Sequence, residues 1–321
     1  MDQTVSTSTP ADFRTINSGK ADFDVIYDDR DPRAYFRVLG GLDYVVPGLA
    51  APVFQQLVAA RAAQQQKPVT ILDLGCSYGI TSALLRFPLS FDQLRGRYMH
   101  PRIQELSSDK MLELDRAYFS SWPGEAGVRV IGLDPSTNAV KYATEVGILD
   151  AGIDEELENH RPSAAAREAL ADVDIVISTG CVGYITERTF DAILGCNKNG
   201  RTPWIASFVL RMFPYDAIDS ALTRHGLTTE KFDGATFVQR RFHNVDEYEQ
   251  TLQTLEAQGI DPEGLETTGL LHAELFVSRP EALIEEKPLN RLVSIVSGQR
   301  VRFGRRFHRI NGDEPRQLLL N

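Results

Sequence analysis

Residues 71–81 read Ile71-Leu72-Asp73-Leu74-Gly75-Cys76-Ser77-Tyr78-Gly79-Ile80-Thr81, and this stretch decides the fold. Its first residues belong to a short apolar run that is typical of a buried strand, and the run ends at an acidic residue. The chain then turns at Gly75 and enters a predicted helix near Gly79. Glycine at such a turn lets a ligand approach the backbone where a side chain would collide. The stretch therefore predicts a nucleotide-type site at the carboxyl end of a parallel strand.

Apolar runs of the same kind recur along the chain, each of them short. Besides residues 69–74, they are residues 128–133, 173–177, 204–210, 235–242 and 271–277. Helical patterns alternate with the first four runs, and this alternation predicts βαβ units and a doubly wound α/β fold. The last two runs flank a predicted helix near residues 245–257, and we expect them to close the sheet in antiparallel orientation.

The glycine turn differs from two common phosphate-binding motifs. It lacks the third glycine of the dinucleotide fingerprint, and no Gly-Lys-Ser/Thr follows it. The pattern instead resembles the first motif of the class I S-adenosylmethionine-dependent methyltransferases, in which an acid precedes the glycine loop. A second motif, Val130-Ile131-Gly132-Leu133-Asp134-Pro135-Ser136, again ends a strand with an acid. The resemblance covers about residues 68–277 and implies S-adenosylmethionine as cofactor and a seven-stranded, mostly parallel, Rossmann-like sheet.

The resemblance also implies which residues hold the cofactor. Asp73, Gly75 and Gly79 would hold its methionine end, and Asp134 would hold its ribose. A carboxylate suits the ribose because its two oxygens can accept two hydrogen bonds in a fork. The full implied set is Asp73, Gly75, Cys76, Gly79, Asp134, Pro135, Asn138, Asp150, Thr179 and Gly180.

Two members of this set have an alternative interpretation. Asp150 follows a poorly marked third strand and would accept a hydrogen bond from the adenine amino group. Several acidic residues come soon after it, so a solvated acidic loop is the alternative. Asn138 would line the adenosine pocket, although a polar residue in the first turn of a helix needs no such role.

A third segment, residues 174–186, ends a strand where the resemblance places the reacting methyl group. Tyr184 in this segment is a candidate to face the sulfonium, where an aromatic ring stabilises a cation by about 0.5–2 kcal/mol. The alternative is that Tyr184 packs against the following helix. Methyl transfer needs a general base only if the acceptor must lose a proton. His243 is our candidate base, with His100 and His272 as further candidates, and an exposed or hydrogen-bonded histidine is the alternative for each.

Composition excludes several classes of function. The 321-residue chain has a net charge of -10, which disfavours general binding to nucleic acid. Its three cysteines form no disulfide framework, and the N-terminus has neither the basic start nor the apolar core of a secretory signal. No apolar run is long enough for a membrane helix, and no metal-binding spacing of histidine or cysteine is present. We therefore expect a cytoplasmic protein with no metal and no membrane contact.

The pattern also predicts how the chain is organised. We expect a flexible leader at residues 1–24, an N-terminal helical cap at 25–66 and a Rossmann-like cofactor-binding domain at 67–280. A helical insertion at 87–127 is far longer than an ordinary connection. The basic extension at 281–321 is either an exposed arm, an element folded onto the acidic body, or a homodimer contact.

Together these features predict an S-adenosylmethionine-dependent methyltransferase that acts on a small-molecule acceptor by in-line methyl transfer. Two alternatives stay open at this point. One is an enzyme of the same fold that cyclises or cleaves S-adenosylmethionine and releases methylthioadenosine. The other is a non-catalytic adenosine-binding protein.

Overall fold

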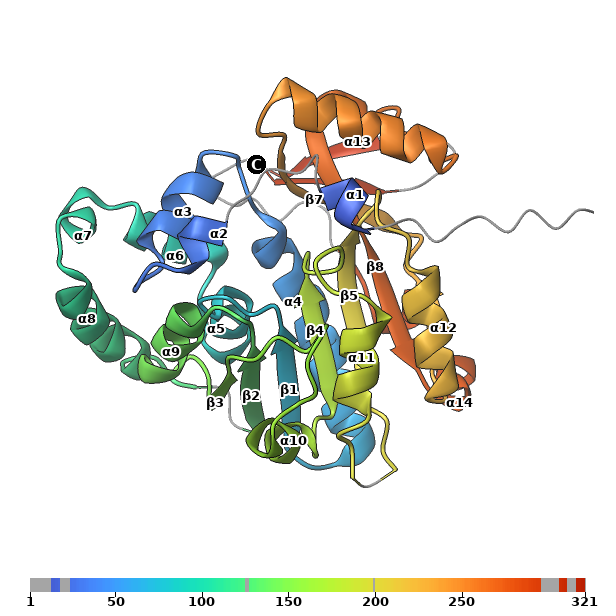
Figure 1. Ribbon diagram of the computed structural model, residues 1–321, viewed down its shortest axis with the longest axis horizontal. Coiled ribbons are helices and arrows are strands. Elements are labelled where there is room, and N and C mark those ends of the chain that lie inside the picture. The colour runs from blue at the N-terminus through green and yellow to red at the C-terminus, as the bar shows by residue number, and fades with distance from the viewer. Residues whose placement is uncertain are drawn as a thin grey trace, which may run out of the picture.

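Every apolar run predicted as a strand forms one in the computed structural model, which describes residues 13–17, 24–124, 127–198, 200–295, 306–310 and 316–320. The strands join into one sheet, which crosses the molecule in Figure 1. They are β1 (Val69–Leu74), β2 (Val128–Leu133), β3 (Ala151–Ile153), β4 (Ile175–Thr179), β5 (Trp204–Leu210), β6 (Thr228–Lys231), β7 (Ala235–Arg241), β8 (Leu270–Arg279), β9 (Arg306–Ile310) and β10 (Arg316–Leu320).

The order of the strands is that of a doubly wound sheet. Strands β3, β2, β1, β4 and β5 lie side by side and run parallel, and β8 then pairs antiparallel with both β5 and β7. The order reverses between β1 and β4, because the chain builds outward from β1 in one direction and from β4 in the other. In sheets of this kind, ligands bind outside the carboxyl ends of the strands at such a reversal. The predicted fold class is confirmed.

The sheet is larger than the seven strands that the resemblance implies. In the described residues it has ten strands, because β6 pairs with β8 and because β9 and β10 extend the edge beyond β7. Strands β9 and β10 pair antiparallel with each other and come from the basic extension. That part of the extension therefore folds onto the sheet.

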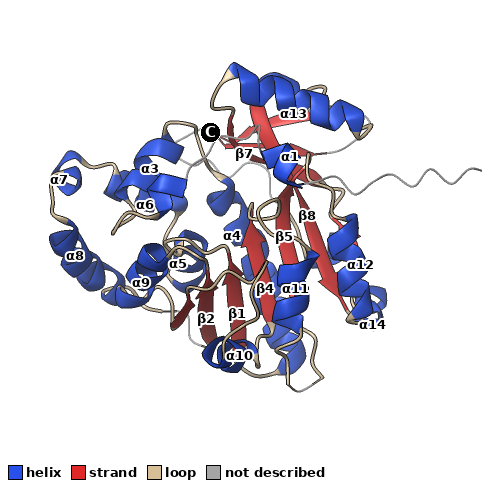
Figure 2. Cartoon of the chain, viewed as in Figure 1, coloured by secondary structure: helices blue, strands red, loops and turns tan. Residues whose placement is uncertain are grey.

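Helices cover both faces of the sheet (Figure 2). One face carries α4 (Val46–Gln65), α5 (Ile80–Arg86) and α9 (Thr137–Glu145), and the other carries α10 (Ala164–Leu170), α11 (Glu187–Leu194) and α12 (Asp216–Arg224). Successive residues of a strand point to opposite faces, so Ile71 joins the first core and Leu72 the second. This burial on both sides explains why the central strands are apolar without interruption.

Further helices lie at the ends of the sheet and beside it. Helix α13 (Val245–Ala257) and the short 3-10 turn η1 (Glu266–Thr268) connect β7 to β8, and α14 (Glu281–Glu286) and α15 (Leu289–Leu292) follow β8. None of the helices in the described ranges has both the length and the apolar character needed to cross a membrane.

The N-terminal helices and the insertion form a separate helical layer beside the sheet, at the left of Figure 1. The layer comprises α2 (Asp24–Tyr27), α3 (Arg33–Gly40), α6 (Phe91–Tyr98), α7 (Pro101–Gln104) and α8 (Ser108–Ser120). Within the expected leader, α1 (Phe13–Asn17) is helical and packs Phe13 edge-on against Phe213. Residues 1–12 and 18–23 lie outside the described residues, and the predicted division into domains stays a prediction.

Aromatic and charged side chains hold this helical layer together. Phe36 of α3 stacks on Tyr98 of α6 with ring centroids 4.8 Å apart. The fully buried Asp115 of α8 accepts hydrogen bonds from Arg97, Tyr98 and Tyr142, the last of which belongs to α9. The insertion is thereby joined both to the N-terminal helices and to the sheet's own helical cover.

Tyr78 anchors the N-terminal segment directly to the glycine turn. Its side chain is fully buried, and its hydroxyl donates hydrogen bonds to the backbone oxygens of Ile26 (2.9 Å) and Asp29 (2.8 Å). Nearby, Asn138 donates to the backbone oxygen of Asp28 at 2.7 Å. Three successive parts of the N-terminal segment are therefore fixed above the end of β1.

We expect Tyr78→Phe to loosen this anchor. The substitution keeps the ring but leaves two carbonyl groups without their donor, which should lower the free energy of unfolding by about 1–2 kcal/mol. Urea unfolding measures the loss, and hydrogen exchange should speed up in residues 24–36. Tyr248→Phe is the matched control, because Tyr248 lies far from this segment on α13. Equal exchange in both variants would contradict the anchoring role.

Candidate active site

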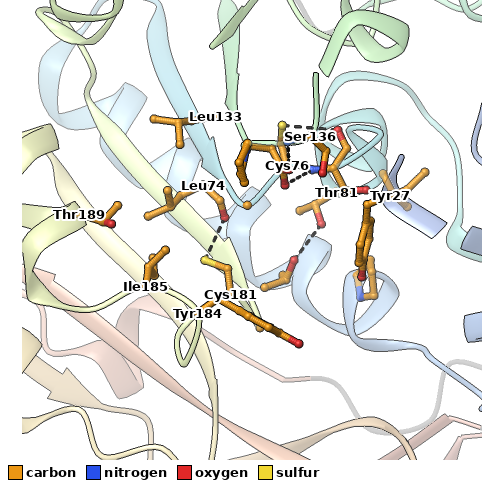
Figure 3. Close-up of a pocket in the computed structure, with 18 of the residues that line it drawn as sticks. Tyr27, Leu74, Cys76, Thr81, Leu133, Ser136, Cys181, Tyr184, Ile185 and Thr189 are labelled. Carbon is orange, nitrogen blue, oxygen red and sulfur yellow. Dashed lines mark hydrogen bonds between the residues drawn. The ribbon is translucent and has the colours of Figure 1, made fainter. Parts of the chain in front are cut away.

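A cavity of about 360 Å³ lies where the strand order reverses, between the sheet and the N-terminal helices. Residues from four places line it: the turn after β1, the end of β2, the segment after β3, and the end of β4. The N-terminal tyrosines and β7 complete the wall. Figure 3 shows eighteen of the lining residues. Among the predicted residues, Gly75, Cys76, Asp134, Pro135, Thr179, Gly180 and Tyr184 belong to this lining.

The turn after β1 has an unusual backbone. Gly75, Ser77 and Gly79 all have positive φ, at 73°, 49° and 71°. Serine rarely adopts this conformation, and here a hydrogen bond stabilises it, because the Ser77 N–H donates to Asp134 Oδ2 at 2.9 Å. The turn is therefore tied to the end of β2, and the two predicted motifs meet in space.

The two glycines serve the packing of the protein on itself. A Cβ atom at Gly75 would lie 2.6 Å from Cys181 Cβ, and one at Gly79 would lie 2.8 Å from a methyl group of Ile148. Gly79 does not line the cavity. The sequence analysis expected both glycines to make room for a ligand, whereas the structure uses them to bring the turn close to the loop after β4 and to the segment before β3.

Asp134 is the acidic group at the centre of the cavity wall. Its Oδ1 accepts from Ser136 N and its Oδ2 from Ser77 N, both at 2.9 Å. Burial raises the pKa of Asp134, and hydrogen bonds from the two backbone N–H groups and from the Ser136 side chain oppose that rise. Beside it, the buried Ser77 Oγ has no hydrogen-bond partner among the described residues. Both groups could satisfy a polar ligand.

Asp73 lies behind the cavity rather than in its wall. Its side chain accepts a hydrogen bond from Ser82 Oγ at 2.6 Å, and only 1% of the residue is exposed. Burial raises the pKa of Asp73 from 3.8 to about 6, against the opposing effect of the Ser82 hydrogen bonds. Asp73 is therefore not part of the cavity lining, where the sequence analysis expected it to contact the cofactor.

The structure corrects the position of Asp150. This residue precedes β3 instead of following it, and β3 enters the sheet parallel to β2, so Asp150 lies at the end of the sheet opposite to the cavity. There it forms an ion pair with Arg86 at 2.6 Å and accepts from Val130 N. The segment that does follow β3 and line the cavity is Glu155, Glu156, Leu157 and Glu158.

Protein donors already hold the three glutamates of that segment. Glu155 accepts from Ser163, which caps α10, and Glu156 accepts from the backbone of Glu158 and Asn159. Glu158 accepts from Thr186 N and from Thr189 Oγ1, both at 2.8 Å. The acidic segment is therefore an ordered wall, not the solvated loop that the sequence analysis considered.

The N-terminal tyrosines form the opposite wall. Tyr27, Tyr35 and Tyr44 line the cavity, and Tyr35 packs edge-on against the other two with centroid distances of 6.2 and 6.0 Å. Burial raises the pKa of all three phenols, so their hydroxyl groups stay neutral. The aromatic cap that the sequence suggested thus reaches the cavity through these residues. Phe91, Tyr98 and Phe119 of the insertion are instead buried in the helix–helix core.

The two candidate catalytic residues differ in position. Tyr184 lines the cavity from the loop after β4, but it is 52% exposed and so lies at the mouth (Figure 3). His243 is exposed after β7 and lies outside the cavity wall, with its backbone N–H donating to Glu247 at 2.7 Å.

Asn138 also lies outside the cavity wall, since its side chain donates to the backbone oxygen of Asp28. The sequence analysis did not single out Ser77, Gln239 or Arg240, which all line the cavity.

Metal-binding groups are not evident here. In the part of the chain that the structure describes, no three histidine, cysteine or acidic side chains are arranged to hold a metal ion. Cys181, which lines the cavity, is close to Ser178 Oγ at 2.9 Å, and burial raises the pKa of its thiol to about 12.

Comparison with known proteins adds three solved structures with a similar arrangement. A plantazolicin methyltransferase, BpumL, in complex with a triazolic desmethylPZN analog and SAH shares 11% identity over 84% of this chain and 98% of its own, with a TM-score of 0.41. Precorrin-6y C5,15-methyltransferase from Geobacter metallireducens shares 11% over 70% and 88%, with a TM-score of 0.34. A SAM-dependent methyltransferase from Geobacter sulfurreducens with S-adenosyl-L-homocysteine shares 13% over 74% and 97%, with a TM-score of 0.33. No family profile and no curated protein matches the sequence.

We expect Asp73→Asn to stabilise the protein above about pH 6. Because the pKa of Asp73 is raised from 3.8 to about 6, the folded state favours the protonated acid. Its ionisation therefore lowers stability as pH rises from about 4 to 6, and the whole loss is present above that range. Asparagine keeps an acceptor for Ser82 without the charge, so the variant should gain roughly 1–3 kcal/mol near pH 8 and nothing near pH 4.

Urea unfolding of both proteins across this pH range measures the difference. Asp150→Asn is the opposite control, because the pKa of Asp150 is lowered by its contacts with Arg86 and Val130 against the effect of burial. That variant should lose stability above about pH 4. If Asp73→Asn proves no more stable than the original near pH 8, Asp73 is not held in an unfavourable charged state.

Proposed function

We propose that this chain is an S-adenosylmethionine-dependent methyltransferase that acts on a small-molecule acceptor. The observation that carries the proposal is the pairing of the two motifs at the strand reversal. The turn after β1 and the carboxylate at the end of β2 meet through the Ser77–Asp134 hydrogen bond and face one cavity. An enclosed site at this position in a doubly wound sheet is where a nucleotide-like ligand is expected.

The residues of the cavity fit the cofactor. Asp134 would take the ribose hydroxyls, since it lines the cavity and a carboxylate can accept more hydrogen bonds than the protein donates to it. Ser77 Oγ, buried without a partner, would gain one from the bound molecule. Leu157 gives an apolar surface for the adenine, and Thr179 and Gly180 would border the reacting end. When bound, S-adenosylmethionine supplies a methyl group on a positively charged sulfur.

The charges around the cavity suit a cation at that end. Burial is the main cause of the raised pKa of Cys181, and the negative charges of Asp134 and Asp73 add to it, so their potential reaches the loop after β4. The phenol of Tyr184 lies at the mouth on the same side. Exclusion of water by the tyrosine wall strengthens these electrostatic effects.

Near the reacting end, the tyrosines and Cys181 are not poised for proton removal, and hydrogen bonds from Thr186 and Thr189 already hold the Glu158 carboxylate. The tyrosines and Cys181 stay protonated near neutral pH because burial raises their pKa values. We therefore propose that the acceptor reacts through an atom that needs no help from a protein base. An amine lone pair, a thiolate or an already ionised oxygen meets this requirement.

The volume of the cavity bears on the choice between methyl transfer and self-cleavage. Pockets for drug-sized ligands span roughly 300–1,000 Å³, and the cavity of about 360 Å³ lies near the lower limit. The cofactor would fill most of it, so only a small acceptor, or one end of a larger one, would fit beside the cofactor. Cyclisation or cleavage of the cofactor would need no second molecule. A cavity of this size therefore also suits that alternative.

Product analysis separates the candidates. The purified chain is incubated with S-adenosylmethionine, alone and with a metabolite extract, and the nucleoside products are identified by mass spectrometry. S-adenosylhomocysteine that forms only with extract supports methyl transfer. Methylthioadenosine that forms without an acceptor, above the spontaneous background, means cyclisation or cleavage, and binding without either product means a non-catalytic adenosine-binding protein.

We expect Asp134→Asn to weaken the binding of S-adenosylhomocysteine by about tenfold to a hundredfold, because a hydrogen bond to a charged group is lost. Isothermal titration measures the affinity, and urea unfolding checks that the variant is folded. Asp150→Asn removes the same charge at the other end of the sheet and should leave the affinity within about twofold. Equal losses in the two variants would place the ligand elsewhere.

A further inference from the structure

Strand β7 leaves its regular pairing at Gln239. Val238 pairs with His272 and Arg240 pairs with Leu271, so Gln239 is an extra residue opposite β8, which is a β-bulge. In a regular strand, consecutive side chains point to opposite faces. Here Gln239 and Arg240 both line the cavity. The bulge therefore brings two consecutive polar side chains to one side, as bulges beside binding sites often do.

The loop that follows α3 holds this bulge in place. Val45 N donates to the Gln239 backbone oxygen at 2.9 Å, and Arg241 N donates to the Leu42 oxygen at 2.7 Å. The N-terminal segment thus runs along the edge of β7 and fixes the backbone on both sides of the bulge. Main-chain hydrogen bonds therefore fix the backbone from which the Gln239 side chain projects.

The side chain of Gln239 is directed to the cavity. Only 4% of the residue is exposed, and it belongs to the cavity lining, so its amide can donate to and accept from a bound molecule. A Cβ atom at Gly180 would lie 2.6 Å from Gln239 Nε2, so the amide lies over the end of β4. An amide in this position is a ready hydrogen-bond partner for a ligand in the cavity.

Arg240 is a second donor beside it. Its guanidinium is 2% exposed and pairs with both oxygens of Glu247, at 2.8 and 2.5 Å, while Nη1 also donates to the Arg241 oxygen. The ion pair cancels the net charge and fixes the guanidinium. Gln239 and Arg240 line the cavity together with the N-terminal tyrosines, Leu39 and Pro47.

We propose that Gln239 recognises the methyl acceptor, and that the acceptor is a planar aromatic molecule carrying an sp² oxygen, as in a carboxylate or a carboxamide. The oxygen accepts from the Gln239 amide and the ring packs among Tyr27, Tyr35 and Tyr44, where aromatic contacts add to the apolar burial. The inference rests on the proposed function, because it takes the rest of the cavity to be filled by the cofactor.

Four small probes test this class of acceptor: benzoate, benzamide, benzylammonium and cyclohexanecarboxylate. Their binding is measured by ligand-detected NMR on the full chain saturated with S-adenosylhomocysteine, whose own binding is measured first by titration. Benzoate or benzamide should bind, and the other two should bind at least about fivefold more weakly, since one lacks the oxygen and one the flat ring.

Two substitutions locate the contact. Gln239→Leu keeps the bulk and should weaken benzoate and benzamide about tenfold or more. Gln239→Glu should weaken benzoate but not benzamide to that extent, because its charge repels the carboxylate. Gln253→Leu, on the exposed side of α13, is the matched control and should change neither. S-adenosylhomocysteine should bind all variants with an affinity within about twofold of the original.

The outcomes distinguish a failure of the proposed function from a failure of the proposed acceptor class. If S-adenosylhomocysteine does not bind the original chain, the proposed function fails and with it the basis of this inference. If it binds but benzylammonium binds best, or no probe binds, the acceptor class is wrong. If benzoate and benzamide bind Gln239→Leu as tightly as the original, Gln239 does not recognise the acceptor.

Discussion

The hydrogen bond from the Ser77 N–H to the Asp134 carboxylate is the contact on which the site depends. It stabilises a non-glycine residue in the left-handed conformation, in a turn that backbone hydrogen bonds from Gly75 and Cys76 to Leu133 also hold. It also joins the ends of β1 and β2, which the order of the strands makes neighbours. The cavity begins at this contact, and the rest of the wall is built around it.

A second constraint closes the cavity from above. Buried Tyr78, one residue after Ser77, donates to two backbone oxygens of the N-terminal segment. The turn that forms one wall of the cavity therefore also holds the N-terminal segment that covers it. The N-terminal segment brings Tyr27 and Tyr35 to the cavity, and residues 42–45, which follow, form hydrogen bonds with β7 on both sides of the bulge at Gln239. Distant parts of the chain are thus coupled through main-chain hydrogen bonds to one short turn.

The sequence predicted the strands and the position of Asp134 well, because apolar runs and strand ends are local features. Within the expected N-terminal helical cap, helix α4 begins at Val46 and includes Pro47, since proline is tolerated in a first helical turn. Asp150 was misplaced because β3 has only three residues and no clear apolar run. Its direction in the sheet, and hence the end that faces the cavity, follows only from pairing with β2.

The polar residues that β7 contributes to the cavity could not be predicted from the local sequence pattern. Gln239 and Arg240 stand in a run that alternates poorly, which was the available signal, but a bulge depends on the pairing with β8 and on the N-terminal loop. The position of Asp73 behind the cavity wall likewise depends on its hydrogen bond with Ser82 in the next helix. Contacts between elements, more than propensities within them, decide which polar groups reach the cavity.

The central claim is that the cavity at the strand reversal binds S-adenosylmethionine through the two motifs. A crystal structure of the chain with S-adenosylhomocysteine tests it most directly. The account predicts the ribose hydroxyls on Asp134, the adenine beside Leu157 and the homocysteine end along Gly75 to Ser77. A ligand bound elsewhere, or an Asp134 carboxylate that makes no contact with the ribose, would contradict it.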